Sequence, residues 1–316
     1  MIRRTRGSRP LLPSPELVPA SPLAGRVGRR SFVAGALSTV AGALVLGACD
    51  DGSTVVTSGS GDGGTSSGSD ASTSSSNGSA SAWATGGTAA MVAKASYPDP
   101  FASATATSCS LTCQATIGPC HTGSALRSDV SDGKDGVPVR LVLRVLDASC
   151  APVSGAFVEI WHTDYRGIYS GNISNMCNTA AEDKAASFMR GYQVTDADGV
   201  VAFDTCFPGW YSSRLVHIHF RVQKGAYQSA DNASSWVISQ LLFADSVVQD
   251  LFTNVSVYSG YGIPDTLLAQ HKDTVFGSTS DVSPYVCDVQ RTSDGAMLAS
   301  KTLVLRESTA TSLCGV

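Results

Sequence analysis

The sequence predicts an all-β domain, a sandwich or a barrel with loops and disulfides, in residues 97–316. Apolar and polar side chains alternate with a period of two in several short segments, as in strands that bury one face. Turns rich in Gly, Pro and Asp separate these segments, and no long segment carries the apolar spacing of a helix. Short strands joined by such turns are typical of a sandwich or a barrel.

Residues 1–48 predict an export signal. Paired arginines, Arg29 and Arg30, stand directly before an apolar run of 16 residues, 33–48, which ends in Leu-Gly-Ala and is followed by Cys. This arrangement resembles a twin-arginine signal peptide. Its ending resembles a bacterial lipobox, in which Cys49 would carry the lipid that anchors the protein to a membrane. The alternative is an uncleaved anchor, for which the run is short. Either way we expect an exported protein.

Residues 49–96 predict a flexible tether between that lipidated cysteine and the domain. The segment is dominated by Ser, Gly, Thr, Asp and Ala, as in TSGSGDGGTSSGSDASTSSSNGSASA, and has almost nothing apolar to bury. The net charge of the chain is −4, and its body carries no basic patch. The charge therefore gives no reason to expect a nucleic-acid partner.

The predicted strands begin at 137–147, where Val139, Leu141, Leu143 and Val145 would share one face. Further strands are expected at 155–162, 216–222, 236–243 and 301–307, and a hairpin is expected at 191–205 around Asp198-Gly199. An Asp-Gly pair favours such a turn because glycine readily adopts a positive φ.

Nine cysteines bear on the compartment and on a rival zinc hypothesis. If Cys49 carries lipid, eight remain, enough for four disulfides in an oxidising compartment, and their connectivity stays open. Cys109 and Cys113 are the only close pair, and no second pair stands at metal-ligand spacing. The spacing therefore disfavours a zinc site.

The segment 208–220, PGWYSSRLVHIHF, concentrates side chains that bind metals. His217 and His219 would share one face of a strand, about 6–7 Å apart at their bases, so both rings could reach one ion. Tyr211 lies six residues before His217, and Tyr169 lies in an earlier turn. Two phenols, whose usual pKa is about 10, ionise together only beside a strongly Lewis-acidic ion. Ferric iron suits such a set better than zinc, magnesium or calcium.

The motifs of residues 161–219 resemble the catalytic core of the intradiol ring-cleavage dioxygenases. In order they are Trp…Gly-x-Tyr, then Asp-x-x-Gly…Phe…Pro-Gly-x-Tyr, then Arg-x-x-His-x-His. This family includes the protocatechuate 3,4-, catechol 1,2- and hydroxyquinol dioxygenases. The short Tyr-to-His spacing is similar to that of the exported single-domain branch. No helical dimerisation segment precedes the domain, so the oligomeric state is left open.

The resemblance implies a β-sandwich that holds non-haem Fe(III) and cleaves catechol-type rings with O2. Its implied iron ligands are Tyr169, Tyr211, His217 and His219, with Tyr211 as the ligand that a catechol displaces. Arg214 would stabilise charge that develops on the substrate, and Gln240 would help to position the ring. Cleavage between the two hydroxylated carbons would give a cis,cis-muconate-type diacid. The sequence does not select one catechol.

Two alternatives and one departure accompany this interpretation. Transthyretin-like or adhesin-type binding modules share the turns of this sequence, but they lack the tyrosine pair and Arg-x-x-His-x-His. An iron-binding but inactive dioxygenase is the second alternative. Many relatives have Gly-Pro-Tyr-Tyr where this chain has Gly-Pro-Cys-His at 118–121. For His121 we expect a surface or loop position rather than a place in the pocket.

Overall fold

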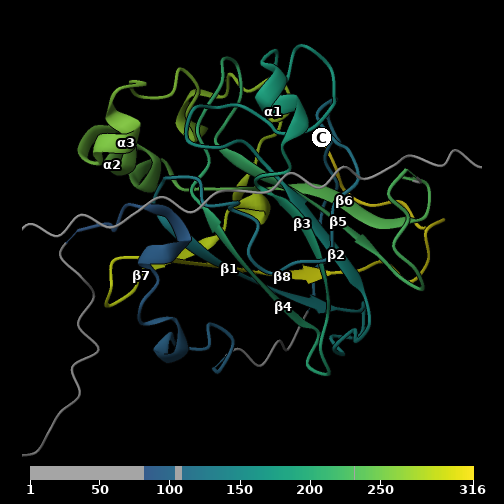
Figure 1. The fold of residues 1–316 in the computed structure, drawn as a ribbon. Helices are drawn as coiled ribbons and strands as arrows, with labels where there is room; N and C mark the ends of the chain where they lie inside the picture. The colour runs from purple at the N-terminus through teal and green to yellow at the C-terminus, as the bar shows by residue number, and fades with distance from the viewer. Residues whose placement is uncertain (1–81, 104–108, 231) are drawn as a thin grey trace, which may run out of the picture. The chain divides into compact units, whose positions relative to one another are not determined.

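The computed structural model describes residues 82–103, 109–230 and 232–316 (Figure 1). The predicted signal segment, Cys49 and most of the predicted tether lie outside the described residues. No helix in the described part of the chain is long and apolar enough to cross a membrane.

Two four-stranded sheets form the domain, as a β-sandwich requires (Figure 1). One sheet has the order β4 (Val200–Cys206), β1 (Pro138–Leu146), β8 (Met297–Val304) and β7 (Asp288–Arg291). The other has the order β3 (Arg190–Val194), β2 (Phe157–Trp161), β5 (His217–Gln223) and β6 (Ser235–Leu242). Strands β1 and β8 pair in parallel, and the other named pairs are antiparallel. The predicted fold class is confirmed.

The core lies between the two sheets and follows the period of two. In β1, the side chains Val139, Leu141, Leu143 and Val145 are completely buried, as predicted. They belong to one apolar cluster with residues of the opposite sheet, including Ile218, Phe220 and Val222 of β5. The alternate residues of β5 include both histidines, and every residue of this strand is buried. One strand therefore contributes to the core with one face and to a polar site with the other.

The predicted hairpin at 191–205 is wrong in its pairing. The turn forms at Gly199, whose φ is +73°, but β3 pairs with β2 whereas β4 pairs with β1. A Cβ atom on Gly199 would lie 2.3 Å from the Val145 carbonyl oxygen, so this turn packs directly on β1. The main-chain N–H of Val145 also donates to the Gly199 carbonyl. These contacts direct the chain from the sheet that contains β3 into the sheet that contains β1 and β4.

Several short elements were not predicted. Helix α2 (Asp245–Asn254) buries Val248, Leu251 and Phe252, a helical spacing that is too short to stand out in the sequence. Strand β7 was missed, and β8 begins at Met297 rather than at 301. The remaining helices are short: α1 (Ala181–Ala185), α3 (Ser256–Ser259), η1 (Gly87–Ala90), η2 (Lys94–Ser96), η3 (Leu268–Gln270) and η4 (Ser283–Tyr285).

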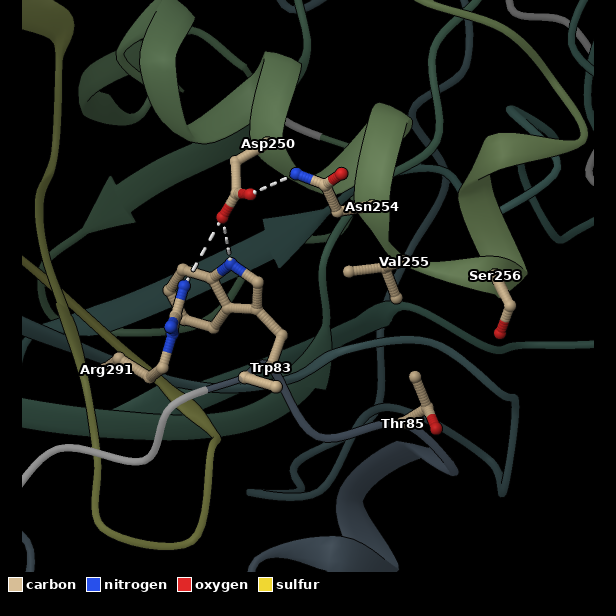
Figure 2. A pocket seen from close by; sticks show the side chains of 8 residues that line it. Trp83, Thr85, Asp250, Asn254, Val255, Ser256 and Arg291 are labelled. Carbon is tan, nitrogen blue, oxygen red and sulfur yellow. Dashed lines mark hydrogen bonds and ion pairs between the residues drawn. The ribbon is translucent and has the colours of Figure 1, made fainter.

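Residues 82–96, which were predicted to belong to the flexible tether, contact the sheet of β1 and β4. The indole Nε1 of Trp83 donates to Asp250 at 2.7 Å, and the Arg291 guanidinium lies 4.1 Å from the indole centroid (Figure 2). These side chains line a cavity of about 410 Å³ that contains none of the four predicted ligands. Two features of the sequence explain this packing. The Trp83 ring anchors the segment, and Gly87 of the Gly86-Gly87 pair fits where any side chain would collide with the Lys134 carbonyl.

Three disulfides join the loops: Cys109–Cys150, Cys113–Cys314 and Cys120–Cys177. A fourth disulfide does not form in the described part of the chain, because Cys206 and Cys287 are buried thiols in different apolar clusters. Such thiols act as small apolar core side chains. The three disulfides indicate an oxidising environment outside the cytoplasm.

Candidate metal centre

The four predicted ligands lie together at one end of β5. The Tyr169 Oη atom lies 3.5 Å from Tyr211 Oη and 3.3 Å from His217 Nε2. Tyr211 Oη lies 3.4 Å from His217 Nε2, which lies 3.1 Å from His219 Nε2. Four potential metal-ligating atoms, from two loops and one strand, therefore form one cluster around His217 Nε2.

The tautomer of His217 is suited to metal binding. Its Nδ1 donates to the Leu215 carbonyl at 2.5 Å, since a carbonyl can only accept. The Nε2 lone pair of the neutral ring then faces the other three donor atoms. Burial, aided by the charge of Arg214, lowers the pKa of His217 to about 3. The ring is therefore neutral at physiological pH, as a metal ligand must be.

His219 is held by stacking. Its ring lies parallel to Trp161, with centroids 4.9 Å apart, and its buried Nδ1 has no hydrogen-bond partner among the described residues. Burial, and then the neighbouring His217, lower the pKa of His219 well below its usual value. His121 packs edge-on against Trp161 at 4.7 Å and contacts Glu159 at 3.2 Å. His121 lies in a loop, as one form of the prediction had it, but its ring does not lie free at the surface, because it packs against Trp161, on which His219 stacks.

The two tyrosines need a cation in order to ionise. Burial raises the pKa of Tyr169 well above 10, and the adjacent Tyr211 adds to this shift. Burial also raises the pKa of Tyr211, although Arg214 opposes the shift. Among the described residues, no group of three or more His, Cys, Asp or Glu could hold a metal ion, so a metal here depends on the tyrosines. Two neutral imidazoles and two phenols fit a hard, strongly Lewis-acidic cation.

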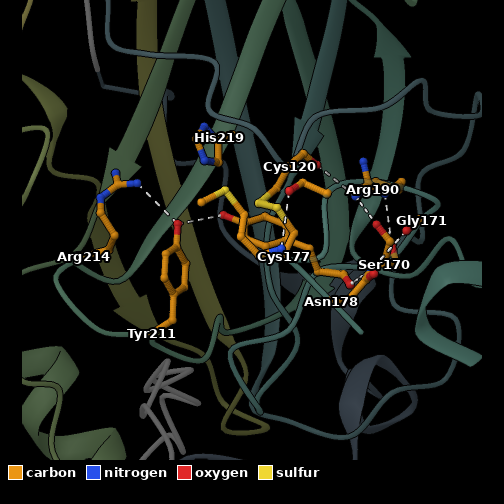
Figure 3. The surroundings of a disulfide bond; sticks show 12 residues. Cys120, Ser170, Gly171, Cys177, Asn178, Arg190, Tyr211, Arg214 and His219 are labelled. Carbon is orange, nitrogen blue, oxygen red and sulfur yellow. Dashed lines mark hydrogen bonds between the residues drawn. A yellow bond between two sulfur atoms is a disulfide. The ribbon is translucent and has the colours of Figure 1, made fainter. Parts of the chain in front are cut away.

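Arg214 and Gln240 lie beside the donor cluster, and Figure 3 shows Arg214 next to Tyr211. Arg214 Nη1 donates to Tyr211 Oη at 3.3 Å, and its Nη2 donates to Gln240 Oε1 at 2.5 Å. Gln240 Nε2 in turn donates to the Thr116 carbonyl at 3.2 Å. The structure thus brings all six predicted site residues together.

Two residues at this site were not predicted from sequence. Asp273 forms a buried salt bridge with Arg214 at 3.1 Å, from a loop that carries no recognisable motif. Gly118 lies over His219, where a Cβ atom would be 3.2 Å from Cε1. Its φ is +70°, and the Gly-Pro pair at 118–119 was a detectable signal in the sequence because such pairs mark turns.

Comparisons with known proteins agree with this geometry. A family model described as "Dioxygenase" matches residues 114–256, a range that contains all four candidate ligands. An intradiol ring-cleavage dioxygenase from Tetranychus urticae is 26% identical, with a TM-score of 0.51 over 63% of this chain and 95% of that chain. In its motifs and in its fold, the chain is similar to the intradiol ring-cleavage dioxygenases.

A second solved structure supports the same family. The dioxygenase designated Tetur07g02040 is 27% identical to this chain, with a TM-score of 0.50 over 63% of this chain and 95% of that chain. No curated protein matches the sequence. None of these matches favours the transthyretin-like or adhesin-type alternative.

Proposed function

We propose that this protein binds non-haem Fe(III) and cleaves catechol-type rings between their two hydroxylated carbons. The observation that carries the proposal is the convergence of Tyr169, Tyr211, His217 and His219, since the other three residues each place a ligand atom 3.1–3.4 Å from His217 Nε2. When bound, ferric iron would ionise the two phenols and make a catechol dianion electron-rich enough to react with O2. Both oxygen atoms enter the cis,cis-muconate-type product, so the reaction needs no external reductant.

The surroundings of the two tyrosines suggest different roles. Tyr169 is only 2% exposed, whereas Tyr211 is partly exposed and lies beside Arg214. Tyr211 is therefore the phenol that a catechol would displace, and the proton of the substrate hydroxyl would pass to its oxygen. Arg214 Nη1 would then donate to an oxygen of the bound ring, and Gln240 would hold the other side of the guanidinium.

Iron content and colour test the proposal. The full-length protein should bind iron stoichiometrically, show a burgundy tyrosinate-to-iron absorption band, and consume O2 when a catechol is added. Y211F and H219A should abolish turnover, whereas Y97F, which removes a phenol that hydrogen-bonds to Asp294, should retain it. A colourless protein that takes up no iron would overturn the proposal. A panel of protocatechuate, catechol, hydroxyquinol and larger catechols would identify the substrate.

We also propose that residues 1–48 export the chain and that Cys49 carries a lipid. Residues 49–81 would then separate the domain from the membrane, and the enzyme would meet aromatic compounds outside the cytoplasm. C49A should release the protein from the membrane fraction into the soluble fraction. Continued membrane association of C49A would favour the uncleaved anchor instead.

A further inference from the structure

A buried carboxylate, Asp273, lies next to the candidate metal centre, on the side of Arg214. It follows η3 in the chain and is only 5% exposed. Its Oδ1 accepts from the main-chain N–H groups of Val275 at 2.7 Å and Phe276 at 2.9 Å. Its Oδ2 faces the segment between Tyr211 and His217. The two oxygens therefore join two loops that are distant in sequence.

The first contact of Oδ2 is with Arg214. Arg214 Nε donates to it at 3.1 Å, while Nη2 donates to Gln240 and Nη1 to Tyr211 Oη. The guanidinium is thus held along two edges, and the nitrogen that remains points at the phenol. A planar guanidinium that is fixed in this way loses little freedom when a charged oxygen binds. Without Asp273, the contacts with Gln240 and with Tyr211, the phenol that a catechol would displace, would be left to fix its direction.

The second contact of Oδ2 is with the main chain of Leu215. The Leu215 N–H donates to Oδ2 at 2.5 Å, and the Leu215 carbonyl accepts the proton of His217 Nδ1. This carbonyl determines which nitrogen of His217 is free to bind a metal. Asp273 therefore restrains the residue that sets the tautomer of a candidate ligand.

We propose that Asp273 is a positioning residue of this enzyme, which aims Arg214 at the substrate oxygen and fixes the main chain that orients His217. The inference rests on the proposed dioxygenase function. Asp273 would act through geometry, because its Oδ2 accepts from the Arg214 side chain and from the Leu215 main chain at once. We call the first contact the Arg214 branch and the second, which leads through Leu215 to His217, the His217 branch. Asn at this position cannot replace that oxygen without losing an acceptor or presenting an N–H₂ group to these donors.

The loop itself provides a matched control. Asp265 accepts from Ser212 Oγ at 2.7 Å and from the Ser213 N–H at 3.2 Å, so it holds the same loop. It is exposed, and its interactions in the described part of the chain do not include Arg214 or Leu215. D273N and D265N therefore make the same chemical change in two carboxylates that bind neighbouring residues of the segment between Tyr211 and His217.

Kinetics of the iron-loaded, full-length protein test the Arg214 branch. D273N should lower kcat by about 10- to 100-fold while it keeps its iron and visible band, whereas D265N should stay within about threefold of wild type. If Asp273 acts through Arg214, the combined loss in D273N/R214A should fall short of the product of the two single losses by about tenfold or more. Losses that simply multiply, or a D273N enzyme with wild-type kcat, would overturn the proposal.

Nitrogen-15 NMR of the metal-free protein tests the His217 branch without any turnover. Wild type and D265N should show one His217 tautomer with the proton on Nδ1, and D273N should show a mixture. An unchanged tautomer in D273N would contradict this branch. If the wild type binds no iron, the proposed function fails, but this measurement still reports on Asp273. Should D273N not fold, D273S keeps an oxygen for Val275 and Phe276 and replaces it in both experiments.

Discussion

Gly118 shows, at the scale of one residue, how a missing side chain leaves room beside His219 at the candidate metal centre. Its φ is +70°, and a Cβ atom would lie 3.2 Å from His219 Cε1 and 3.6 Å from Nε2. Gly133 has the same φ of +70°, but a Cβ atom there would have no neighbour within 4 Å. Substitutions at the two glycines therefore distinguish the effect of backbone strain, which both share, from the effect of crowding at the site, which only Gly118 has.

G118A and G133A should both lower the free energy of unfolding by about 1–2 kcal/mol, because a Cβ atom disfavours left-handed backbone. Only G118A should also lower kcat/KM with a catechol, by about tenfold or more, because it displaces the His219 ring. Thermal unfolding and oxygen-electrode kinetics on both variants check this. Equal activity in the two variants would show that Gly118 matters only for its backbone conformation.

His162 gives the domain a predictable response to acid. It is completely buried, its Nδ1 donates to the Thr163 carbonyl, and burial lowers its pKa from 6.5 to about 4. The unfolded chain therefore binds a proton below pH 6.5 that the folded chain refuses until about pH 4. Stability should fall by roughly 3 kcal/mol as the pH drops through this window, and it should be fully present above pH 6.5.

Urea unfolding of the metal-free protein between pH 7 and pH 4 measures this effect. H162N should lose stability at pH 7 but should show a shallower dependence on pH than wild type. H271N, at an exposed position, should retain the wild-type dependence. The same slope in wild type and H162N would mean that other groups account for the acid sensitivity.

At this scale, sequence predicts residues whose chemistry is local. Two histidines on one strand face, with two tyrosines in nearby turns, could be identified from their residue types and spacing, whereas Arg214 and Gln240 were implied by the resemblance to a known family. Asp273 could not, since its partner Arg214 lies 59 positions away and an Asp in a loop is ordinary. The role of His121 also depends on long-range packing against Trp161.

At the scale of elements, one disulfide restrains the loop that carries Tyr169. Cys120–Cys177 joins this loop to the segment over the site, and Asn178 Nδ2 donates to the Tyr169 carbonyl at 2.8 Å (Figure 3). Arg190 adds hydrogen bonds to the carbonyls of Ser170 and Cys120. Several independent contacts thus fix the main chain on both sides of one candidate ligand.

Removing this disulfide should affect both stability and metal binding. C120A/C177A should lose about 4 kcal/mol by the chain-entropy argument, and it should release iron faster to a chelator. C109A/C150A is the control. The Cys109–Cys150 disulfide spans 41 residues against 57 for Cys120–Cys177, so its removal should lower the free energy of unfolding by a similar amount. Urea unfolding and the rate of iron loss check the two variants. Equal rates of iron loss would show that the disulfide does not support Tyr169.

Element predictions failed where pairing depends on distant contacts. Strands β3 and β4 follow one another through a well-formed turn, yet each pairs in a different sheet. The contact of Gly199 with β1 decides this outcome, and no local pattern reveals it. The strands themselves were predictable because alternation depends only on which face is buried.

At the scale of the whole molecule, the folded unit begins before the predicted domain boundary. Trp83 reaches Asp250 on α2, and Lys94 forms a salt bridge with Asp204 of β4 at 2.7 Å. The Tyr97 hydroxyl donates to Asp294 at 2.9 Å. The segment therefore ties the N-terminal side of the domain to three distant parts of the chain.

A chain that starts at residue 82 should be more stable than one that starts at residue 98. The longer chain should gain about 2 kcal/mol or more, largely from the partly buried Trp83 and the main-chain hydrogen bonds around it. Both chains should bind iron equally, because the contacts described for residues 82–97 involve none of the four candidate ligands. W83A in the longer chain should lower its free energy of unfolding and so remove part of this gain. Equal melting temperatures for the two chains would show that the segment adds no stability.

The alternation of β5 also bears on how the molecule reaches a single structure. A shift of one residue in its pairing would turn Ile218 and Phe220 toward the tyrosines and would place both imidazoles in the apolar core. Such a misaligned sheet would present no complete donor set. If the protein binds the proposed ferric iron, only molecules with the correct strand pairing would take it up, and the intensity of the visible band would report the fraction of such molecules.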